Sequence, residues 1–390
     1  MKKICVVTAT RAEYGLLKPL MLALKNDNQF SLQVLVTGAH LSPEFGYTYK
    51  QIEDDGFTID QKIEMLLSAD TSTSIVKTMG LGMIGFADAL EKLNPDALVV
   101  LGDRYEMLAI AASATVMKIP IIHLYGGDIT EGAYDDAFRH AITKLSNLHF
   151  TSTEEYRKRV IQMGENPINV FNVGAIGIDN IKNLNLLSKE KLGQELDVEW
   201  NKNVYQITYH PETLSNTSSE KLFKELLNAL DELEDSTLIF TKANADTDGR
   251  IINQMIDDYV SKNKDKAKAF SSLGSLRFLS LLSFCDGVIG NSSSGIVEVP
   301  TFKIPTINIG NRQKGRIQST SIINCNTNKE AIVEAINFSK SEGFKNILHA
   351  SNNPYGEGKT TNKIMETLKK SDFISLKIKS FYNIDTCSNE

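Results

Sequence analysis

VVLGDRYEMLAIAASATVMKIPIIHLYGGDITEGAYDDAFRH, residues 99–140, decides the fold, because two apolar runs in it are each followed by a dense cluster of ionisable side chains. The runs at 99–101 and 119–124 are predicted to be short buried strands. In open α/β sheets, ligands bind just outside the carboxyl ends of the strands. We therefore expect a ligand-binding cleft lined by the residues that follow the two runs, which are Asp103, Arg104, Glu106, His123, Asp128, Glu131, Asp135, Asp136, Arg139 and His140.

The first half of the chain repeats this alternation of apolar strands and amphipathic helices. The alternation predicts a parallel, doubly wound α/β sheet. Strands are expected at 3–9, 32–37, 97–101, 120–124, 148–151 and 170–173, and helices at 13–25, 75–93, 106–117, 138–144 and 154–163.

The second half begins a new series of strands. From 174 to 200 the apolar strand signal lapses, and we interpret the polar run 188–199 as a hinge segment. Further strands are expected at 205–209, 237–241, 287–290 and 306–308. We predict two Rossmann-like, doubly wound α/β domains facing each other across a cleft, over residues 1–180 and 200–360. The last helix and tail, residues 361–390, are left open between the two domains, with packing back on the first as one alternative.

Composition favours a cytoplasmic enzyme. The 390 residues suffice for two or three domains, and 42 Lys and Arg against 48 Asp and Glu give a net charge of −6. That sign argues against a surface that attracts nucleic acid or acidic lipid. The early apolar run ICVVTA is too short for a signal peptide or a membrane span. Four widely spaced cysteines, Cys5, Cys285, Cys325 and Cys387, are interpreted as buried or incidental thiols.

Two glycine-containing motifs are set aside. GLGMIG at 80–85 matches the dinucleotide pattern GxGxxG, but it follows a polar, helix-like stretch instead of a strand, so we interpret its glycines as close helix packing. Gly358, Lys359 and Thr360 resemble the end of a phosphate loop, but Asn353 occupies the position of the first glycine and no strand leads into it. We therefore expect neither a dinucleotide nor an ATP site.

A strand-to-helix turn in the second half is suited to an anion. GNSSSG at 290–295 follows an apolar strand, and such a turn offers backbone N–H groups, hydroxyls and a positive helix end. The alternative is a set of serines that only cap the helix. His210 at the end of another strand, Glu298 one turn later and Arg312 beside a further strand favour the first interpretation. Together they predict a nucleoside diphosphate site, in which Glu298 accepts the ribose hydroxyls.

These residues belong to motifs that resemble one family, the hydrolysing UDP-N-acetylglucosamine 2-epimerases of bacterial sialic acid biosynthesis. The likeness runs over nearly the whole chain, and several motifs in one order are more specific than any one alone. They are TATRAEYGLLKPL at 8–20, LGDRYE at 101–106, GGDITEGAYDDAFRHAITKLS at 126–146, TSTEEYRKRVIQMGENP at 151–167, HPETLS at 210–215, NADT at 244–247, IGNSSSGIVEVP at 289–300 and INIGNRQKGR at 307–316.

The resemblance implies a GT-B-like fold in which the second domain holds most of the UDP. By motif, Arg11 would reach the ligand from the first domain, and Leu273 and Phe278 would pack on the uracil. The remaining positions that the resemblance assigns to UDP are His210, Asn244, Ser292, Ser293, Glu298 and Arg312. It implies no cofactor and no metal.

The reaction of the family eliminates UDP to a glucal intermediate, to which water adds to give N-acetylmannosamine. Inversion at C2 needs a proton to leave one face and another to arrive on the opposite face, so two groups must flank the ring. The resemblance points to Asp103 and Asp135, with Arg104 and His210 stabilising charge on the departing diphosphate. Which aspartate is the base stays open, and a structural helix-capping role for both is the alternative.

Tyr125 is the clear departure, because some relatives carry a catalytic glutamate at that position. Either the Tyr125 phenol donates a proton, or Asp128 or Glu131 serves instead, or the substrate differs. The last alternative matters because related enzymes act on UDP-linked 2,4-diacetamido-2,4,6-trideoxy sugars in legionaminic acid synthesis.

Two other function classes share the expected architecture. A GT-B glycosyltransferase would also bind a UDP-sugar, but it needs a basic or apolar rim for its acceptor, and no basic cluster is found in the sequence. A non-catalytic nucleotide-sugar sensor would need no pair of carboxylates. The expected partner is a small nucleotide sugar, with no nucleic acid and no membrane, and we expect a homodimer or homotetramer.

Overall fold

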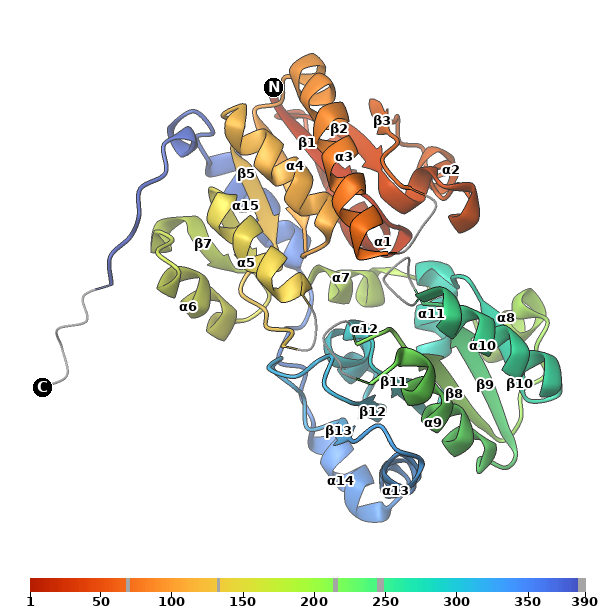
Figure 1. Cartoon of the computed structure of the whole chain (residues 1–390). Helices are drawn as coiled ribbons and strands as arrows, with labels where there is room; N and C mark the ends of the chain where they lie inside the picture. The colour runs from red at the N-terminus through yellow and green to blue at the C-terminus, as the bar shows by residue number, and fades with distance from the viewer. Residues whose placement is uncertain (68–70, 132–133, 213–216, 244–248, 385–390) are drawn as a thin grey trace, which may run out of the picture. The chain divides into compact units, whose positions relative to one another are not determined.

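The computed structural model describes residues 1–67, 71–131, 134–212, 217–243 and 249–384 (Figure 1). The chain divides into two compact units. Unit 1 comprises Met1–Asp128, Asp135–Asn180 and Tyr355–Glu390, and unit 2 comprises Ile129–Tyr134 and Ile181–Pro354. The chain therefore crosses between the units more than once, and each unit is described by itself.

Unit 1 is built on a parallel sheet in the order β3-β2-β1-β4-β5-β6-β7. Six of its strands coincide with predicted ones, and the short edge strand β3 was not predicted. The bounds are β1 (Lys2–Thr8), β2 (Phe30–Thr37), β3 (Gln61–Ile63), β4 (Ala97–Leu101), β5 (Ile121–Leu124), β6 (Leu148–Thr151) and β7 (Val170–Asn172).

Helices cover both faces of this sheet. Alternate residues of β1 serve the two faces, because Ile4 and Val6 belong to one apolar cluster and Cys5 and Val7 to the other. The first cluster packs against α1 and α15, and the second against α3, α4 and α5. The helices are α1 (Arg11–Asn26), α2 (Tyr49–Asp54), α3 (Ser72–Leu93), α4 (Tyr105–Val116), α5 (Asp135–Leu145), α6 (Glu154–Gln162), α7 (Ile176–Asn183), which runs past the unit boundary, and α15 (Thr360–Lys370).

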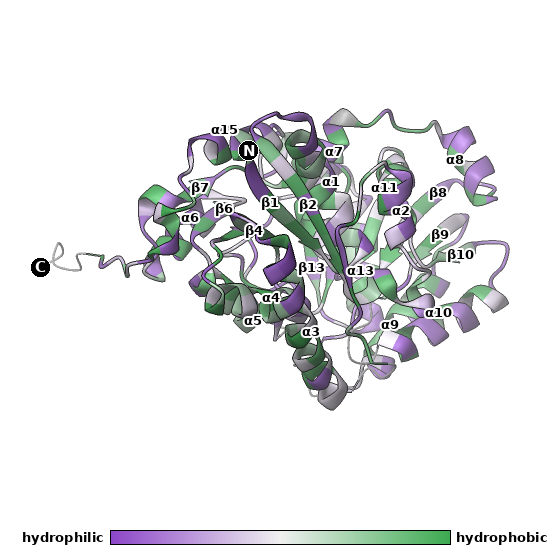
Figure 2. Ribbon diagram, turned by 90° about the horizontal axis from the view of Figure 1, so that it is seen from above, coloured by the Kyte–Doolittle hydropathy of each residue, from purple (hydrophilic) through white to green (hydrophobic). Residues whose placement is uncertain are grey.

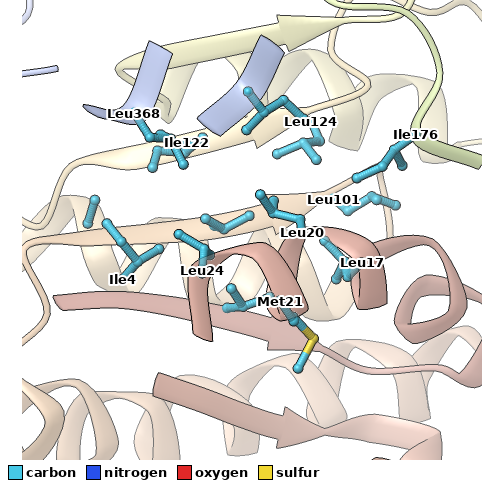
Figure 3. Close-up of a cluster of buried hydrophobic side chains, with 14 of the residues drawn as sticks. Ile4, Leu17, Leu20, Met21, Leu24, Leu101, Ile122, Leu124, Ile176 and Leu368 are labelled. Atoms are coloured by element: carbon cyan, nitrogen blue, oxygen red, sulfur yellow. The ribbon is translucent and has the colours of Figure 1, made fainter. Parts of the chain in front are cut away.

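Figure 3 shows the first of these clusters in detail. Side chains from α1 meet side chains from the strands and from α15, so helices far apart in sequence share one core. The labelled residues are Ile4, Leu17, Leu20, Met21, Leu24, Leu101, Ile122, Leu124, Ile176 and Leu368.

Unit 2 repeats the architecture with the order β10-β9-β8-β11-β12-β13, again parallel. Its strands are β8 (Asn203–Thr208), β9 (Ser236–Thr241), β10 (Ala267–Phe270), β11 (Gly287–Gly290), β12 (Thr306–Ile309) and β13 (Ile322–Cys325). Its helices are α8 (Lys189–Leu196), α9 (Ser219–Asp231), α10 (Gly249–Lys262), α11 (Gly274–Leu282), α12 (Ser293–Val297), α13 (Lys329–Ser339) and α14 (Glu342–Ala350). The edge strands β10 and β13 were not predicted.

Both sheets thus confirm the predicted doubly wound α/β fold. The arrangement follows from hydropathy, since β1, β2 and β4 are largely hydrophobic in Figure 2, whereas the visible faces of α9 and α10 are rich in hydrophilic residues. Among the described residues, no helix combines the length and the apolar character that a membrane span needs.

The predicted hinge at 188–199 is wrong. Most of that stretch is helix α8, and Leu192 and Leu196 are buried in an apolar cluster of unit 2. The polar residues that suggested a linker are the solvent side of an amphipathic helix.

The two motifs that were set aside lie in other settings. GLGMIG lies inside α3. Gly82 gives room to the side chain of Met65, in the loop after β3, and Gly85 gives room to Ile63 of β3. The glycines therefore allow close packing of α3 on this strand and loop, and not on another helix as expected. At the start of α15, the Asp179 carboxylate accepts the backbone N–H groups of Thr360 (2.9 Å) and Thr361 (2.7 Å). That helix end is therefore already capped by an anion of the protein itself.

We predict that Asp179→Ala lowers the free energy of unfolding by about 1–2 kcal/mol, the range for loss of a helix cap. Urea denaturation of both proteins measures the difference. Glu366→Ala, at an exposed position of the same helix, is the control and should stay within about 0.5 kcal/mol of the parent. Equal stability of Asp179→Ala and the parent would contradict the capping role.

Candidate functional site

A buried guanidinium joins the polar residues at the carboxyl end of the unit 1 sheet. Arg139 of α5 is only 1% exposed and pairs with the Asp103 carboxylate just beyond β4. It also donates to Asp136 Oδ1 (3.1 Å) and to the carbonyl of Asp128 (3.0 Å), just beyond β5. Arg139 thus fixes the ends of two neighbouring strands and the start of a helix relative to one another.

Asp135, the second predicted acid–base residue, is the first residue of α5 and is half-buried. A carboxylate in the first turn of a helix is favoured by the helix dipole. The next residue, Asp136, shares Arg139 with Asp103 and lies 3.4 Å from His140 Nε2. The structure therefore brings the Asp103 carboxylate and the first turn of α5 together through Arg139, which the sequence had placed only among the charged residues of this region.

Arg104 is bound by a buried carboxylate. Its Nε and Nη2 donate to Glu106 at 3.0 and 3.2 Å, and Glu106 is fully buried. This fork-like pairing orients the guanidinium at the start of α4. We still predict that Arg104 contacts the diphosphate of the substrate.

A second buried carboxylate lies at the start of α1. Glu13 Oε2 accepts the N–H groups of Ala9 (2.8 Å) and Thr10 (3.1 Å), and Thr10 caps the helix in return. Burial raises the pKa of Glu13 to about 7, although the Arg104 charge acts in the opposite direction. Arg11 is the half-buried first residue of this helix, so the capping box fixes the backbone at the position of Arg11.

His123 is a structural residue of β5. Its Nε2 lies 2.8 Å from the carbonyl of Gly102, which only accepts, so Nε2 carries the proton. Burial lowers the pKa of His123 to about 3, which keeps the ring neutral. The histidine thus holds the turn that leads into Asp103.

Tyr125, Asp128 and Glu131, the three residues that could serve in place of the catalytic glutamate of some relatives, lie in different environments. Tyr125 has a φ of 68°, packs against the core and accepts the Gly177 N–H with its hydroxyl at 3.3 Å, at the start of α7. Asp128 is buried, with Ser152 Oγ 3.4 Å from its Oδ1. Glu131, which belongs to unit 2, is exposed and pairs with Lys314 of the same unit at 3.1 Å.

In unit 2, Asn291 fastens the end of β8 to the end of β11. Its side-chain oxygen accepts the N–H of His210 (2.7 Å) and its amide N–H₂ donates to the carbonyl of the same residue (2.8 Å). The preceding Gly290 has a φ of 144°, and a Cβ there would overlap the Thr208 carbonyl. Only glycine therefore lets the two strand ends approach so closely.

Arg312 also contacts Asn291. The backbone carbonyl of Asn291 accepts from Arg312 Nη1 (3.2 Å) and from the buried side chain of Gln313 (2.8 Å). Thus His210 and Arg312, which are 102 residues apart in sequence, are both fixed by Asn291. Neither Asn291 nor Gln313 was singled out from the sequence, since an amide side chain carries no distinctive pattern.

The serine turn begins the five-residue helix α12. Ser292 caps it through the N–H of Ser294, and Ser293 is exposed. The Ser294 hydroxyl donates to the half-buried Glu298 carboxylate. Burial raises the pKa of Glu298 to about 7. The serines therefore do cap a helix, but Ser293 is left accessible and Glu298 is held one turn away.

The predicted uracil contacts lie in one apolar cluster of unit 2. Leu273 is buried directly before α11, and Phe278 on that helix is half-buried against the same cluster. Asn244, the remaining predicted contact, lies outside the described residues. Within the described parts of the chain, no cluster of three or more His, Cys, Asp or Glu side chains is arranged to hold a metal ion.

Comparison with known proteins relates the chain as a whole to one family. The family model for UDP-N-acetylglucosamine 2-epimerase matches residues 22–369. The GDP/UDP-N,N'-diacetylbacillosamine 2-epimerase (hydrolyzing) of Campylobacter jejuni is 48% identical, over 95% of this chain and 96% of that protein. Polysialic acid biosynthesis protein P7 of Escherichia coli is 39% identical, over 100% of this chain and 99% of that protein. The UDP-N,N'-diacetylbacillosamine 2-epimerase (hydrolyzing) of Legionella pneumophila is 33% identical, over 95% and 96%.

Solved structures agree at the level of the fold. The UDP-GlcNAc 2-epimerase of Neisseria meningitidis bound to UDP-GlcNAc has a TM-score of 0.79 at 19% identity, covering 95% of this chain and 100% of that chain. The Methanocaldococcus jannaschii enzyme in complex with UDP-GlcNAc and UDP has a TM-score of 0.77 at 21% identity, with the same coverage.

We predict that Glu298→Gln gains stability relative to the parent as the pH rises from 5 to 8. The pKa of Glu298 is raised in the folded protein, so the parent loses stability between the ordinary glutamate pKa and about 7, whereas glutamine does not titrate. Chemical denaturation at both pH values measures the change. A stability difference that is the same at pH 5 and pH 8 would contradict a raised pKa.

Proposed function

Because the chain belongs to the UDP-N-acetylglucosamine 2-epimerase family, we propose that it is a hydrolysing 2-epimerase of a UDP-linked 2-acetamido sugar. The observation that carries this proposal is the Arg139 cluster, in which one buried cation orders the Asp103 carboxylate and the start of α5. A non-catalytic nucleotide-sugar sensor has no need of paired carboxylates at this edge of the sheet, and the basic cluster that would serve the acceptor of a transferase is not found in the sequence.

The proposed chemistry has two stages. A base removes the proton from C2, the C1–O bond to UDP breaks, and the electron pair forms the C1–C2 double bond of a glucal. Water then adds to C1 while a proton is delivered to the opposite face of C2, giving the free 2-epimer and UDP. We assign the two proton transfers to Asp103 and Asp135, with Arg139 holding Asp103 in a fixed orientation.

We assign UDP to unit 2. His210 and Arg312, fixed by Asn291, supply donors for the diphosphate, together with the Ser292 and Ser293 turn. Glu298 is placed one turn further on to accept the ribose hydroxyls. We assign the uracil to the apolar cluster that includes the buried Leu273 and the half-buried Phe278, and we assign Arg11 to the diphosphate.

Two sugars are candidates. UDP-N,N'-diacetylbacillosamine, the 2,4-diacetamido-2,4,6-trideoxy sugar, is our first choice, because relatives 48% and 33% identical carry that substrate in their names. UDP-N-acetylglucosamine, which the sequence motifs favoured, is the second, because the family model that matches the chain carries that substrate in its name and a relative 39% identical is named for polysialic acid biosynthesis. Its product would be N-acetylmannosamine for sialic acid synthesis.

Incubation of the purified protein with each UDP-sugar alone tests the proposal. Equimolar release of UDP and of the free 2-epimer is expected, faster with the diacetamido sugar. Release that requires an added acceptor would indicate a glycosyltransferase, and binding without release would indicate a sensor, so either result contradicts the proposal.

The expected homodimer or homotetramer stays a proposal, which the exposed apolar residues Val76, Met83 and Ile84 on α3 support.

We predict that Asp103→Asn and Asp135→Asn each lower turnover by about 100-fold or more, the loss typical of a general acid or base. UDP affinity, measured by calorimetry, should stay within about twofold because UDP is assigned to unit 2. His210→Ala is the matched control, with weakened UDP affinity. Turnover like that of the parent in either aspartate variant would assign that residue a structural role.

We predict that Tyr125→Phe retains turnover within about fivefold, because its hydroxyl accepts the Gly177 N–H and loss of one hydrogen bond costs about 1 kcal/mol. Asp128→Asn, tested beside it, should show the larger loss if Asp128 replaces the missing glutamate. A 100-fold loss in Tyr125→Phe would make the phenol the proton donor instead.

A further inference from the structure

The turn that follows β5 is held by two arginines, which donate to consecutive backbone carbonyls. Arg139 of α5 donates from Nη1 to the carbonyl of Asp128 (3.0 Å). Arg159 of α6 donates from Nη1 to the carbonyl of Gly127. All of these residues belong to unit 1. The proposed chemistry uses Arg139 and leaves Arg159 without an assigned role.

The backbone of this turn departs from the regular sheet. Tyr125 has a φ of 68° and Gly127 a φ of 84°, both in the left-handed region. A Cβ on Gly127 would lie 2.5 Å from the carbonyl oxygen of Tyr156, so the turn packs directly on the backbone of α6. Gly127 is buried and lies beyond the end of β5. Its carbonyl needs a donor from elsewhere, and Arg159 supplies one.

The bond to Gly127 is the buried contact of Arg159. The other printed partner of its guanidinium is Glu155 on the same helix, 3.5 Å away, and that carboxylate is 63% exposed. An exposed pair at this distance contributes little to the orientation of a side chain. A charged donor on a buried carbonyl forms the stronger kind of hydrogen bond. Arg159 is therefore directed at the turn and not at its neighbour on α6.

A short series of contacts connects this bond to the acid–base residues. The Asp128 carbonyl, one residue after Gly127, is an acceptor of Arg139, and the same guanidinium pairs with Asp103. Only two soft backbone dihedral angles separate consecutive carbonyls. The position of the Gly127 carbonyl thus restricts where the Asp128 carbonyl meets Arg139. A shift of the turn would change the set of acceptors that orients Arg139 and, with it, Asp103.

We propose that Arg159 is a positioning residue for the reaction, an inference that rests on the proposed function. It holds the Gly127 carbonyl, and this keeps the Asp128 carbonyl in place as an acceptor of Arg139. Arg139 in turn holds the Asp103 carboxylate. Arg159 acts through the turn and contacts no reacting atom. A small displacement of an acid–base group lowers the rate of proton transfer, so the effect of Arg159 is expected in kcat.

The experiment compares three variants of the full chain. Arg159→Met keeps an unbranched apolar side chain and removes the donors, whereas Arg159→Lys keeps the charge and a donor. Lys158→Met, at the exposed neighbouring position of α6, is the matched control for loss of one positive charge. The measurements are kcat and KM with the UDP-sugar, UDP affinity by calorimetry, and backbone deuterium uptake of residues 125–128. Arg159→Lys carries the test if Arg159→Met does not fold.

Arg159→Met should lower kcat about tenfold, less than the roughly 100-fold that a misplacement of about 1 Å can cost. Arg159→Lys should lower kcat about threefold, and Lys158→Met should match the parent. UDP affinity should stay within about twofold in all three variants, because UDP is assigned to unit 2. Residues 125–128 should exchange faster in Arg159→Met.

A double-variant cycle separates positioning from a general loss of structure. If Arg159 acts through Asp103, its replacement has little left to disturb once Asp103 is asparagine. Arg159→Met in the Asp103→Asn background should therefore lower kcat by less than about twofold. A general structural defect would instead multiply the two losses.

Four results would overturn the positioning role. They are parent-like kcat in Arg159→Met, an equal loss in Lys158→Met, multiplied losses in the double variant, and a parallel loss of UDP affinity. Absence of epimerase activity in the parent would refute the proposed function instead. The deuterium uptake of residues 125–128 would then still decide whether Arg159 holds the turn, and unchanged uptake in Arg159→Met would show that it does not.

Discussion

The buried guanidinium of Arg139 is the interaction on which the unit 1 site depends. An ion buried without partners costs about 3–5 kcal/mol, so the surrounding acceptors are required for the fold as well as for any chemistry. Those acceptors, Asp103, the Asp128 carbonyl and Asp136, come from the ends of β4 and β5 and from the start of α5. They converge because β4 and β5 are neighbours in a parallel sheet. A planar fork of donors suits this arrangement better than the single ammonium of lysine.

In unit 2, the side-chain amide of Asn291 connects the strand ends, as the guanidinium of Arg139 does in unit 1. Asn291 binds both backbone groups of His210 at the end of β8, and its own carbonyl receives Arg312 and Gln313. The buried Asn291 side chain and Gly290 thus fix the backbone that leads into the serine turn. In both units, a buried polar side chain ties together loops at the carboxyl ends of adjacent strands, where ligands bind in open α/β sheets.

The central strands could be predicted because strands buried on both faces read as continuous apolar runs. The runs at 99–101 and 119–124 lie at β4 and β5 for this reason. Edge strand β3 has no buried residue and gives no such signal, and α8 was mistaken for a hinge because its buried face is only two leucines wide. The roles of Arg139 and Asn291 could not be predicted, since their partners lie 36 and 81 residues away and only the sheet order brings them together.

The origin of the hydrogen at C2 of the product tests the central claim most directly. Elimination and rehydration exchange that hydrogen with solvent, whereas hydrolysis of the sugar–phosphate bond alone leaves it untouched. With a UDP-2-acetamido sugar in D₂O, the account predicts a free sugar that is inverted at C2 and carries one deuterium there, by NMR and mass spectrometry. A product that keeps its original C2 configuration with hydrogen at that carbon would contradict it.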